Sequence, residues 1–216
     1  MPEQLWPSSS APARRQCLRA LGTASLWAWS AAQAQPKNAA AQRIVALGGA
    51  LTEVVYALGA EGRLVGTDTT SVHPPAALQT AKVGYMRQLS AEGLLSLRPD
   101  AVLGTHEAGP AVVLEQVRSA GVQVELVQAD HSWQEVQRKL QLVGRMTGRS
   151  AAAQALQARL DGEWAQTQQQ VARAAQRPRA LFILAHSGSP MVAGTNTAAD
   201  ALIRFAGGVN VAASFE

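Results

Sequence analysis

The stretch Arg43-Ile44-Val45-Ala46-Leu47-Gly48-Gly49, with the residues that follow it, decides the fold. Its apolar run, closed by two glycines, predicts a buried strand that ends in a turn. In residues 51–59, apolar side chains recur at i, i+3, i+4 and i+7: Leu51, Val54, Val55 and Leu58. This spacing predicts a helix with one apolar face. A strand that leads directly into a helix is the repeating unit of a parallel sheet with crossover helices.

Strand and helix patterns alternate over the next part of the chain. Short apolar runs that predict strands lie at residues 64–67, 100–104 and 122–127. Helices are predicted from Ser90, a favourable N-cap, and over residues 110–120. This order predicts an α/β fold, and we assign residues 35–131 to an N-terminal α/β lobe.

The pattern changes at residue 132. Residues 133–146 predict one helix, and residues 151–176, with Ser150 as the cap, predict a second helix of roughly 39 Å. A crossover helix in a compact domain does not need this length. We therefore interpret residues 132–177 as a helical segment whose long helix is a rigid spacer between two lobes.

A strand–helix pattern begins again after the long helix. Residues 179–185 predict a parallel strand, His186 follows it in a loop, and Asn196 or Thr197 caps a further helix. Residues 178–216 thus predict the start of a C-terminal α/β lobe. Because roughly 38 residues cannot bury a full core alone, we expect this second lobe to be incomplete, or truncated.

The N-terminus has the layout of an export signal. Arg14, Arg15 and Arg19 form a basic start, an apolar run extends over residues 18–31 around the last of them, and Ala32-Gln33-Ala34 is a small-x-small cleavage pattern. We interpret residues 1–34 as a signal peptide, since the apolar run is too short to span a bilayer comfortably. Cleavage would remove Cys17, the only cysteine, and an exported protein without disulfides would remain.

Charge excludes one class of partner. Without residues 1–34 the Lys+Arg count falls from 19 to 16 and the Asp+Glu count from 15 to 14, so the net charge falls from +4 to +2. A nearly neutral chain without a basic block is not expected to bind nucleic acid.

The most informative side chain is Tyr85, one of only two tyrosines. It lies in Lys82-Val83-Gly84-Tyr85-Met86-Arg87-Gln88-Leu89-Ser90, on a predicted loop between a strand region and a helix. A phenolate is a hard anionic ligand that suits ferric iron. Arg87, two residues on, is placed to donate a hydrogen bond to the phenolate oxygen and to lower its basicity.

Other motifs are weaker. His73, His106 and His131 show no metal-ligand spacing and are interpreted as loop histidines. Neither G-x-G-x-x-G after the first strand nor G-K-[ST] is present, and the region after His186 is not a G-x-S-x-G turn. A nucleotide-dependent enzyme and an esterase are therefore poorly supported.

Taken together, residues 43–216 resemble the periplasmic substrate-binding proteins of haem ABC importers. These belong to a group that also carries cobalamin and ferric siderophores. Residues 83–93 are the most haem-specific part of the resemblance. It implies a two-lobed periplasmic binding protein with a long interlobe helix and a ligand between the lobes, most of whose second lobe would follow Glu216.

The resemblance also implies a function and partners. The protein would capture ferric haem in the periplasm and deliver it to an inner-membrane ABC permease, with an outer-membrane haem uptake system upstream, and it would not be an enzyme. The two alternatives are a cobalamin or ferric-siderophore binder of the same build, and an exported α/β enzyme.

For a haem ligand, five residues receive roles. Tyr85 would ligate the iron, Arg87 would tune it, and His186 would approach from the second lobe as a second iron ligand, since imidazole is a known haem ligand. Met86 would contact the porphyrin face. Lys82 and Arg87 are candidate partners of the haem propionates, because arginine suits carboxylates.

Overall fold

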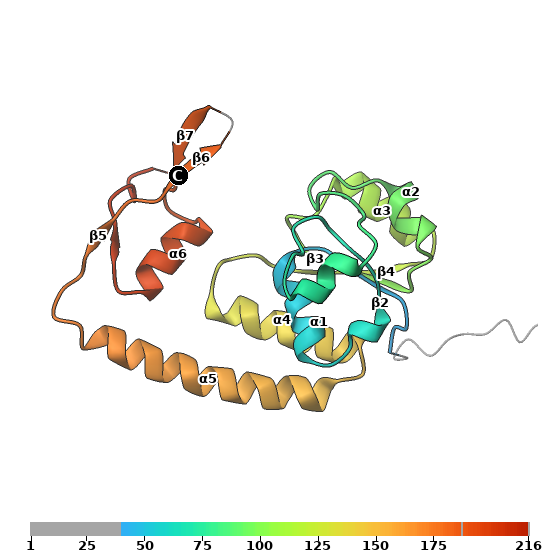
Figure 1. Cartoon of the computed structure of the whole chain (residues 1–216), viewed down its shortest axis with the longest axis horizontal. Coiled ribbons are helices and arrows are strands. Elements are labelled where there is room, and N and C mark those ends of the chain that lie inside the picture. The colour runs from blue at the N-terminus through green and yellow to red at the C-terminus, as the bar shows by residue number, and fades with distance from the viewer. Residues whose placement is uncertain (1–39, 187, 216) are drawn as a thin grey trace, which may run out of the picture. The chain divides into compact units, whose positions relative to one another are not determined.

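The computed structural model describes residues 40–186 and 188–215, so the predicted signal peptide lies outside the described residues. Residues 40–131 are called the first lobe below. Its elements are β1 (Ile44–Ala46), α1 (Gly49–Ala57), η1 (Glu61–Arg63), β2 (Leu64–Thr67), η2 (Pro75–Gln79), α2 (Ala91–Ser96), β3 (Ala101–Thr105), α3 (Ala111–Ser119) and β4 (Gln123–Val127). The four strands form one sheet in the order β2-β1-β3-β4, and every neighbouring pair is parallel (Figure 1). The predicted parallel sheet is confirmed.

Two apolar cores lie on the two faces of this sheet, because successive strand residues point to opposite faces. Ile44 of β1 packs in one buried cluster with Leu51 of α1. The next residue, Val45, packs in the other with Leu94 of α2 and Leu114 of α3. Helices therefore cover both faces, as the alternation of strand and helix predicts. The predicted apolar face of α1 is confirmed, since all four of its residues pack in or against the first cluster: Leu51, Val54, Val55 and Leu58.

Two consecutive helices follow the first lobe: α4 (Trp133–Met146) and α5 (Ser150–Ala172). The predicted bounds of α4 are confirmed. α5 begins at Ser150 itself, with Arg149 at the N-cap position and no capping side-chain bond, so the predicted cap was wrong. α5 ends at Ala172 rather than at residue 176, and its 23 residues span about 34 Å.

The part after α5 contains shorter elements: β5 (Arg179–Ala180), β6 (Ile183–His186), β7 (Ser189–Val192), α6 (Ala198–Phe205) and β8 (Val209–Asn210). β5 pairs with β8 in parallel, whereas β6 pairs with β7 in antiparallel fashion. The single parallel strand predicted over residues 179–185 was therefore wrong. Gly188, at a φ of 93°, lies where the chain reverses between β6 and β7. Of the two predicted caps of α6, Thr197 is the one whose side chain accepts a hydrogen bond, from the N–H of Asp200.

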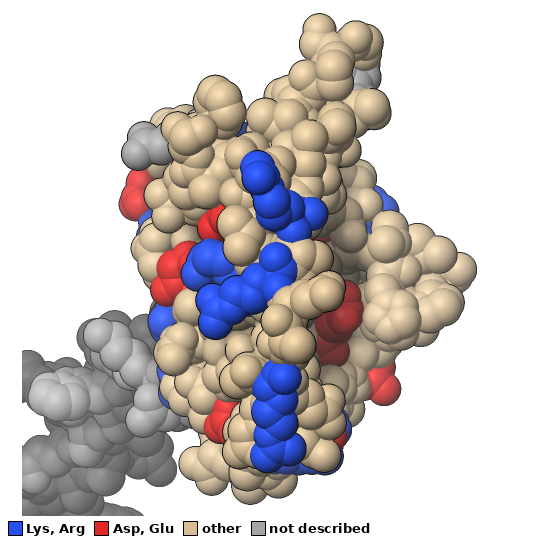
Figure 2. Space-filling model, turned by 90° about the vertical axis from the view of Figure 1, so that its left-hand side faces the viewer, with Lys and Arg blue, Asp and Glu red and all other residues tan. Residues whose placement is uncertain are grey.

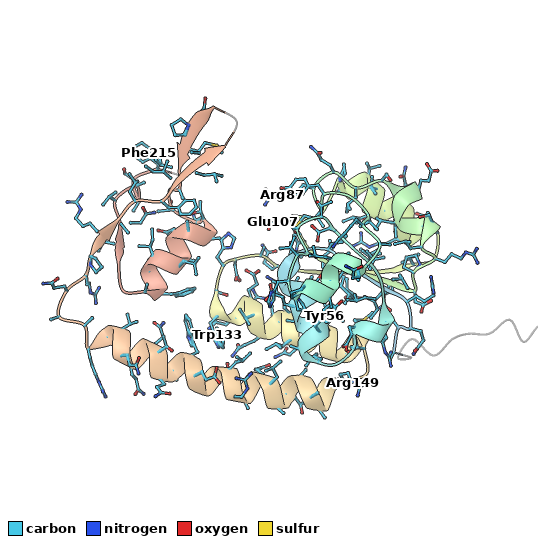
Figure 3. All side chains as sticks on the ribbon, in the orientation of Figure 1. Tyr56, Arg87, Glu107, Trp133, Arg149 and Phe215 are labelled. Atoms are coloured by element: carbon cyan, nitrogen blue, oxygen red, sulfur yellow. The ribbon has the colours of Figure 1, made fainter. Side chains whose placement is uncertain are left out.

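An aromatic stack links α4, α5 and α6. The rings of Trp133 and Trp164 lie parallel at 1°, with centroids 4.7 Å apart. Phe205 meets Trp164 edge-on at 90° and 4.8 Å. Trp133, labelled in Figure 3, also donates a hydrogen bond from Nε1 to Asp161 at 2.7 Å. Within the described ranges, none of the helices has both the length and the apolar character required to cross a membrane.

Candidate ligand-binding site

The Tyr85 loop is attached to the carboxyl end of the parallel sheet. Residues 81–84 run beside the end of β2: the N–H of Thr67 donates to the carbonyl of Ala81 (2.9 Å), and the N–H of Val83 donates back to Thr67 (3.0 Å). The N–H of Thr69 then donates to the carbonyl of Gly84 at 2.9 Å. In open α/β sheets, ligands bind at this end of the strands. The predicted loop position of Tyr85 is confirmed by this backbone pairing.

A tight turn presents the phenol. The N–H of Gln88 donates to the carbonyl of Tyr85 at 2.8 Å, which closes a four-residue turn. Gly84 enters the turn with a φ of 97°, a conformation that favours glycine. On the far side, the carbonyl of Met86 accepts from the N–H of Gly109 at 2.9 Å. Backbone bonds thus hold the loop on both sides, while Tyr85 keeps 40% of its surface exposed. The backbone of the loop is thus held in place while the phenol of Tyr85 is accessible from solvent.

A buried carboxylate organises the same end of the sheet. Asp68, directly after β2, is fully buried, and its Oδ1 accepts from the N–H of Gly48 (2.9 Å) and the hydroxyl of Ser71 (2.7 Å). Its Oδ2 accepts from the N–H (3.0 Å) and hydroxyl (2.6 Å) of Thr70. Burial by itself raises the pKa of Asp68, but these hydrogen bonds outweigh it and hold the pKa below the usual range. Asp68 therefore carries its charge and fixes the loops after β1 and β2.

Arg87 does not take the predicted position. Its Nη2 donates to Oε1 of Glu107 at 2.6 Å, and within the described residues it makes no hydrogen bond to Tyr85 (Figure 3). Glu107 lies in the turn after β3, twenty residues along the chain. The predicted Arg87–Tyr85 hydrogen bond is therefore not present in this structure, because a carboxylate from the next loop competes for the guanidinium.

Lys82 and Met86 have structural contacts within the first lobe. The Lys82 ammonium donates to Thr67 Oγ1 and the Ser71 carbonyl, both at 2.8 Å, and to the Ala77 carbonyl at 3.1 Å. These bonds use its three protons. Met86 is partly buried and packs against the core cluster that contains Leu94 of α2 and Leu114 of α3. Both side chains thus make contacts within the first lobe.

His186 was predicted to approach the ligand because it was expected to follow a parallel strand, and the structure does not show that strand. It is the last residue of β6, where its backbone pairs with Ser189 in the antiparallel hairpin. It therefore does not follow a parallel strand, and the position of its side chain lies outside what the structure describes. Across residues 40–186 and 188–215, no three His, Cys, Asp or Glu side chains are grouped as a metal site.

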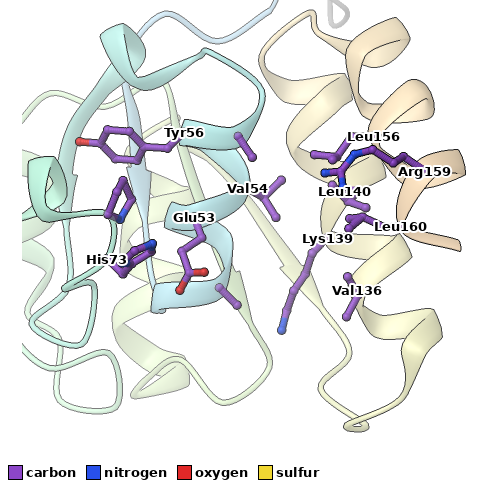
Figure 4. Close-up of a pocket in the computed structure, with 13 residues that line it drawn as sticks. Glu53, Val54, Tyr56, His73, Val136, Lys139, Leu140, Leu156, Arg159 and Leu160 are labelled. Carbon is purple, nitrogen blue, oxygen red and sulfur yellow. The ribbon is translucent and has the colours of Figure 1, made fainter. Parts of the chain in front are cut away.

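A separate apolar cavity of about 700 Å³ lies between α1, the loop before η2, α4 and α5 (Figure 4). Tyr56 and Glu53 of α1 lie on one wall, and Arg159 of α5 lies on the other. Among the predicted site residues whose side chains the structure describes, none lines this cavity: Lys82, Tyr85, Met86 and Arg87 all lie elsewhere. Its size alone does not make it the functional site, since the exposed phenol and the loop anchoring occur elsewhere.

Sequence reasoning missed two residues. Asp68 follows β2 and Glu107 follows β3, so both lie just beyond the carboxyl ends of parallel strands. Their position directly after predicted strands could have marked them as site residues, because side chains at the carboxyl ends of parallel strands gather at one edge of the sheet. Their particular partners depend on how the loops cross, which the sequence does not reveal.

Comparison with known proteins gives a consistent result. Residues 44–215 match the family described as periplasmic binding protein. The periplasmic heme-binding protein BhuT, solved in complex with two hemes, is 46% identical, with a TM-score of 0.74 over 78% of this chain and 66% of that chain. A periplasmic heme-binding protein from Pseudomonas aeruginosa is 40% identical, with a TM-score of 0.73 over 80% and 63%.

One similar protein is named for a different ligand. The cobalamin-binding protein of Halobacterium salinarum is 33% identical over 175 residues, which are 80% of this chain and 46% of that protein. The chain thus spans about half the length of this relative.

Proposed function

The chain belongs to the periplasmic binding protein family, and from this premise we propose that it captures ferric haem in the periplasm and delivers it to an inner-membrane ABC importer. It binds and releases haem without changing it chemically. An outer-membrane haem uptake system would supply the ligand upstream. The similarity to two heme-binding proteins at 46% and 40% identity supports haem as the ligand.

One observation carries the proposal. Tyr85 is an exposed phenol on a loop that backbone hydrogen bonds hold at the carboxyl end of the sheet. A phenolate oxygen is an axial ligand for ferric haem, and the iron replaces the phenol proton when it binds. Because the loop is already ordered, little conformational freedom is lost on binding. We propose Tyr85 as the iron ligand, with His186 of the β6–β7 hairpin as the candidate second ligand.

Cobalamin is the second candidate, because the Halobacterium salinarum relative is named a cobalamin-binding protein. Cobalamin carries its own cobalt ligands and neutral amide side chains. It would not need an anionic phenolate or a cation for carboxylates. The two ligands therefore make different demands on Tyr85 and Arg87.

Spectroscopic titration tests the choice. Hemin added to the purified full-length protein should give a shifted Soret band and a ferric–tyrosinate charge-transfer band. Tyr85→Phe should abolish the charge-transfer band and weaken binding at least about tenfold, which corresponds to about 1.4 kcal/mol. Tyr56→Phe is the matched control, since Tyr56 is the only other tyrosine and lies in α1. Saturable binding of cyanocobalamin with no hemin spectrum would refute the haem assignment.

A further inference from the structure

The Arg87–Glu107 pair is built on two loops that the backbone already joins. The N–H of Gly109 donates to the carbonyl of Met86 at 2.9 Å, and the N–H of Leu89 donates to the carbonyl of Gly109 at 3.0 Å. These bonds place the turn after β3 against the Tyr85 turn. Glu107 and Arg87 extend from the joined segments and meet at 2.6 Å. The pair therefore follows from the fold rather than from a chance encounter of two long side chains.

This pair differs from the other ion pairs of the described residues. Those pairs join residues three to eight positions apart, within one helix or at its start. Arg87 and Glu107 are twenty residues apart and join two different loops beside the proposed ligand residue. Figure 2 shows the opposite side of the chain, at the left of Figure 1, where both basic and acidic side chains lie among uncharged surface. An ion pair that links two site loops is thus distinctive in this chain.

The pair is also easy to open. The side chains of Arg87 and Glu107 are 54% and 41% exposed. Water screens ion pairs at this exposure, so they contribute little and exchange partners readily. A ligand carboxylate can take the place of the Glu107 carboxylate on Arg87, because the planar donors of a guanidinium match the two oxygens of any carboxylate.

We propose that Glu107 occupies the carboxylate-binding position of Arg87 in the ligand-free protein, and that a propionate of haem replaces it on binding. This inference rests on the proposed function of Tyr85 as the haem ligand. Glu107 is then a positioning residue: it keeps Arg87 extended beside Tyr85 and competes with the incoming ligand. The site would select tetrapyrroles with free carboxylates over tetrapyrroles with neutral side chains.

Two ligands that differ only in their carboxylates provide the test. Hemin and hemin dimethyl ester, in which both propionates are esterified, are titrated into wild-type protein and Glu107→Gln. The control is Glu115→Gln, which removes the same charge from another exposed Glu–Arg pair, that with Arg118 in α3. Circular dichroism melting checks that both variants fold. The same titrations are repeated in an Arg87→Ala background.

The expected result is selective. Glu107→Gln should bind hemin about two- to fivefold more tightly than wild type, which is the range that loss of one exposed ion pair allows. The gain should disappear with the dimethyl ester and in the Arg87→Ala background, while Glu115→Gln should match wild type. Equal hemin affinities for Glu107→Gln and Glu115→Gln would overturn the inference, and so would an equal gain with the ester.

Failure of the proposed function looks different. If wild-type protein shows no hemin spectrum that depends on Tyr85, the proposed function is wrong and the inference falls with it. If that spectrum is present and Glu107→Gln has no selective effect, only the inference is refuted.

Discussion

Replacing Asp68 by asparagine is expected to lower the free energy of unfolding by about 3 kcal/mol at pH 7. The carboxylate is fully buried and accepts four hydrogen bonds, two on each oxygen. The asparagine oxygen can keep the two bonds from Gly48 and Ser71. Its NH₂ group, however, faces the N–H of Thr70, and two donors cannot bond.

The magnitude follows from these contacts. The part-buried N–H of Thr70 would lose its acceptor at a cost of about 1–3 kcal/mol, and two charge-assisted bonds that become neutral lose about 1 kcal/mol more in total. Together these effects give about 2–4 kcal/mol. That is a large share of the roughly 5–15 kcal/mol by which domains are stable.

The effect should also depend on pH. The pKa of Asp68 is lowered in the folded protein, because its hydrogen bonds outweigh the effect of burial. A lowered folded-state pKa means that the carboxylate stabilises the fold above its unfolded pKa of about 4 and that this stability is lost as the pH falls. The difference between wild type and Asp68→Asn should therefore shrink as the pH falls from about 5 to 3.

Urea unfolding followed by circular dichroism measures this directly. Glu115→Gln serves as the control for the loss of one negative charge, and it should differ from wild type by less than about 0.5 kcal/mol. A loss below about 1 kcal/mol for Asp68→Asn, or a difference that grows as the pH falls, would refute the assigned hydrogen-bond role.

Three further predictions concern stability. Trp164→Ala should lower the unfolding free energy by about 2–4 kcal/mol, since it removes the contacts with both Trp133 and Phe205, and Trp164→Phe should recover part of the loss in the same urea assay. Leu51→Ala should cost about 2–5 kcal/mol in thermal or urea unfolding, because the side chain is 1% exposed in the first-lobe core. Burial by itself raises the pKa of Glu135, but the ion pair and hydrogen bonds of this carboxylate outweigh burial, so its pKa is lowered in the folded protein. Glu135→Gln should therefore lower the free energy of unfolding at pH 7, and urea unfolding should show a smaller loss as the pH falls toward 3.

Much of the first lobe was predictable because its signals are local. The spacing of Leu51, Val54, Val55 and Leu58 specifies one face of a helix, and that face is buried in the structure. Residues 133–146 formed the predicted helix for the same reason. The region after α5 was harder. The apolar run at residues 179–185 suits one buried strand, but large side chains of this run, such as Ile183 at 54%, are exposed, and the run divides between two pairings.

The site shows the same division. Local signals were enough to place Tyr85 on a loop between a strand region and a helix, because glycine, turn and cap signals act over a few residues. The folded chain was needed to show that Arg87 meets Glu107 and that the Lys82 ammonium donates to partners within the lobe. Partners of charged side chains depend on which loops cross at the sheet edge. That crossing is set by strand order and by backbone bonds between distant segments, and a linear pattern carries no information about it.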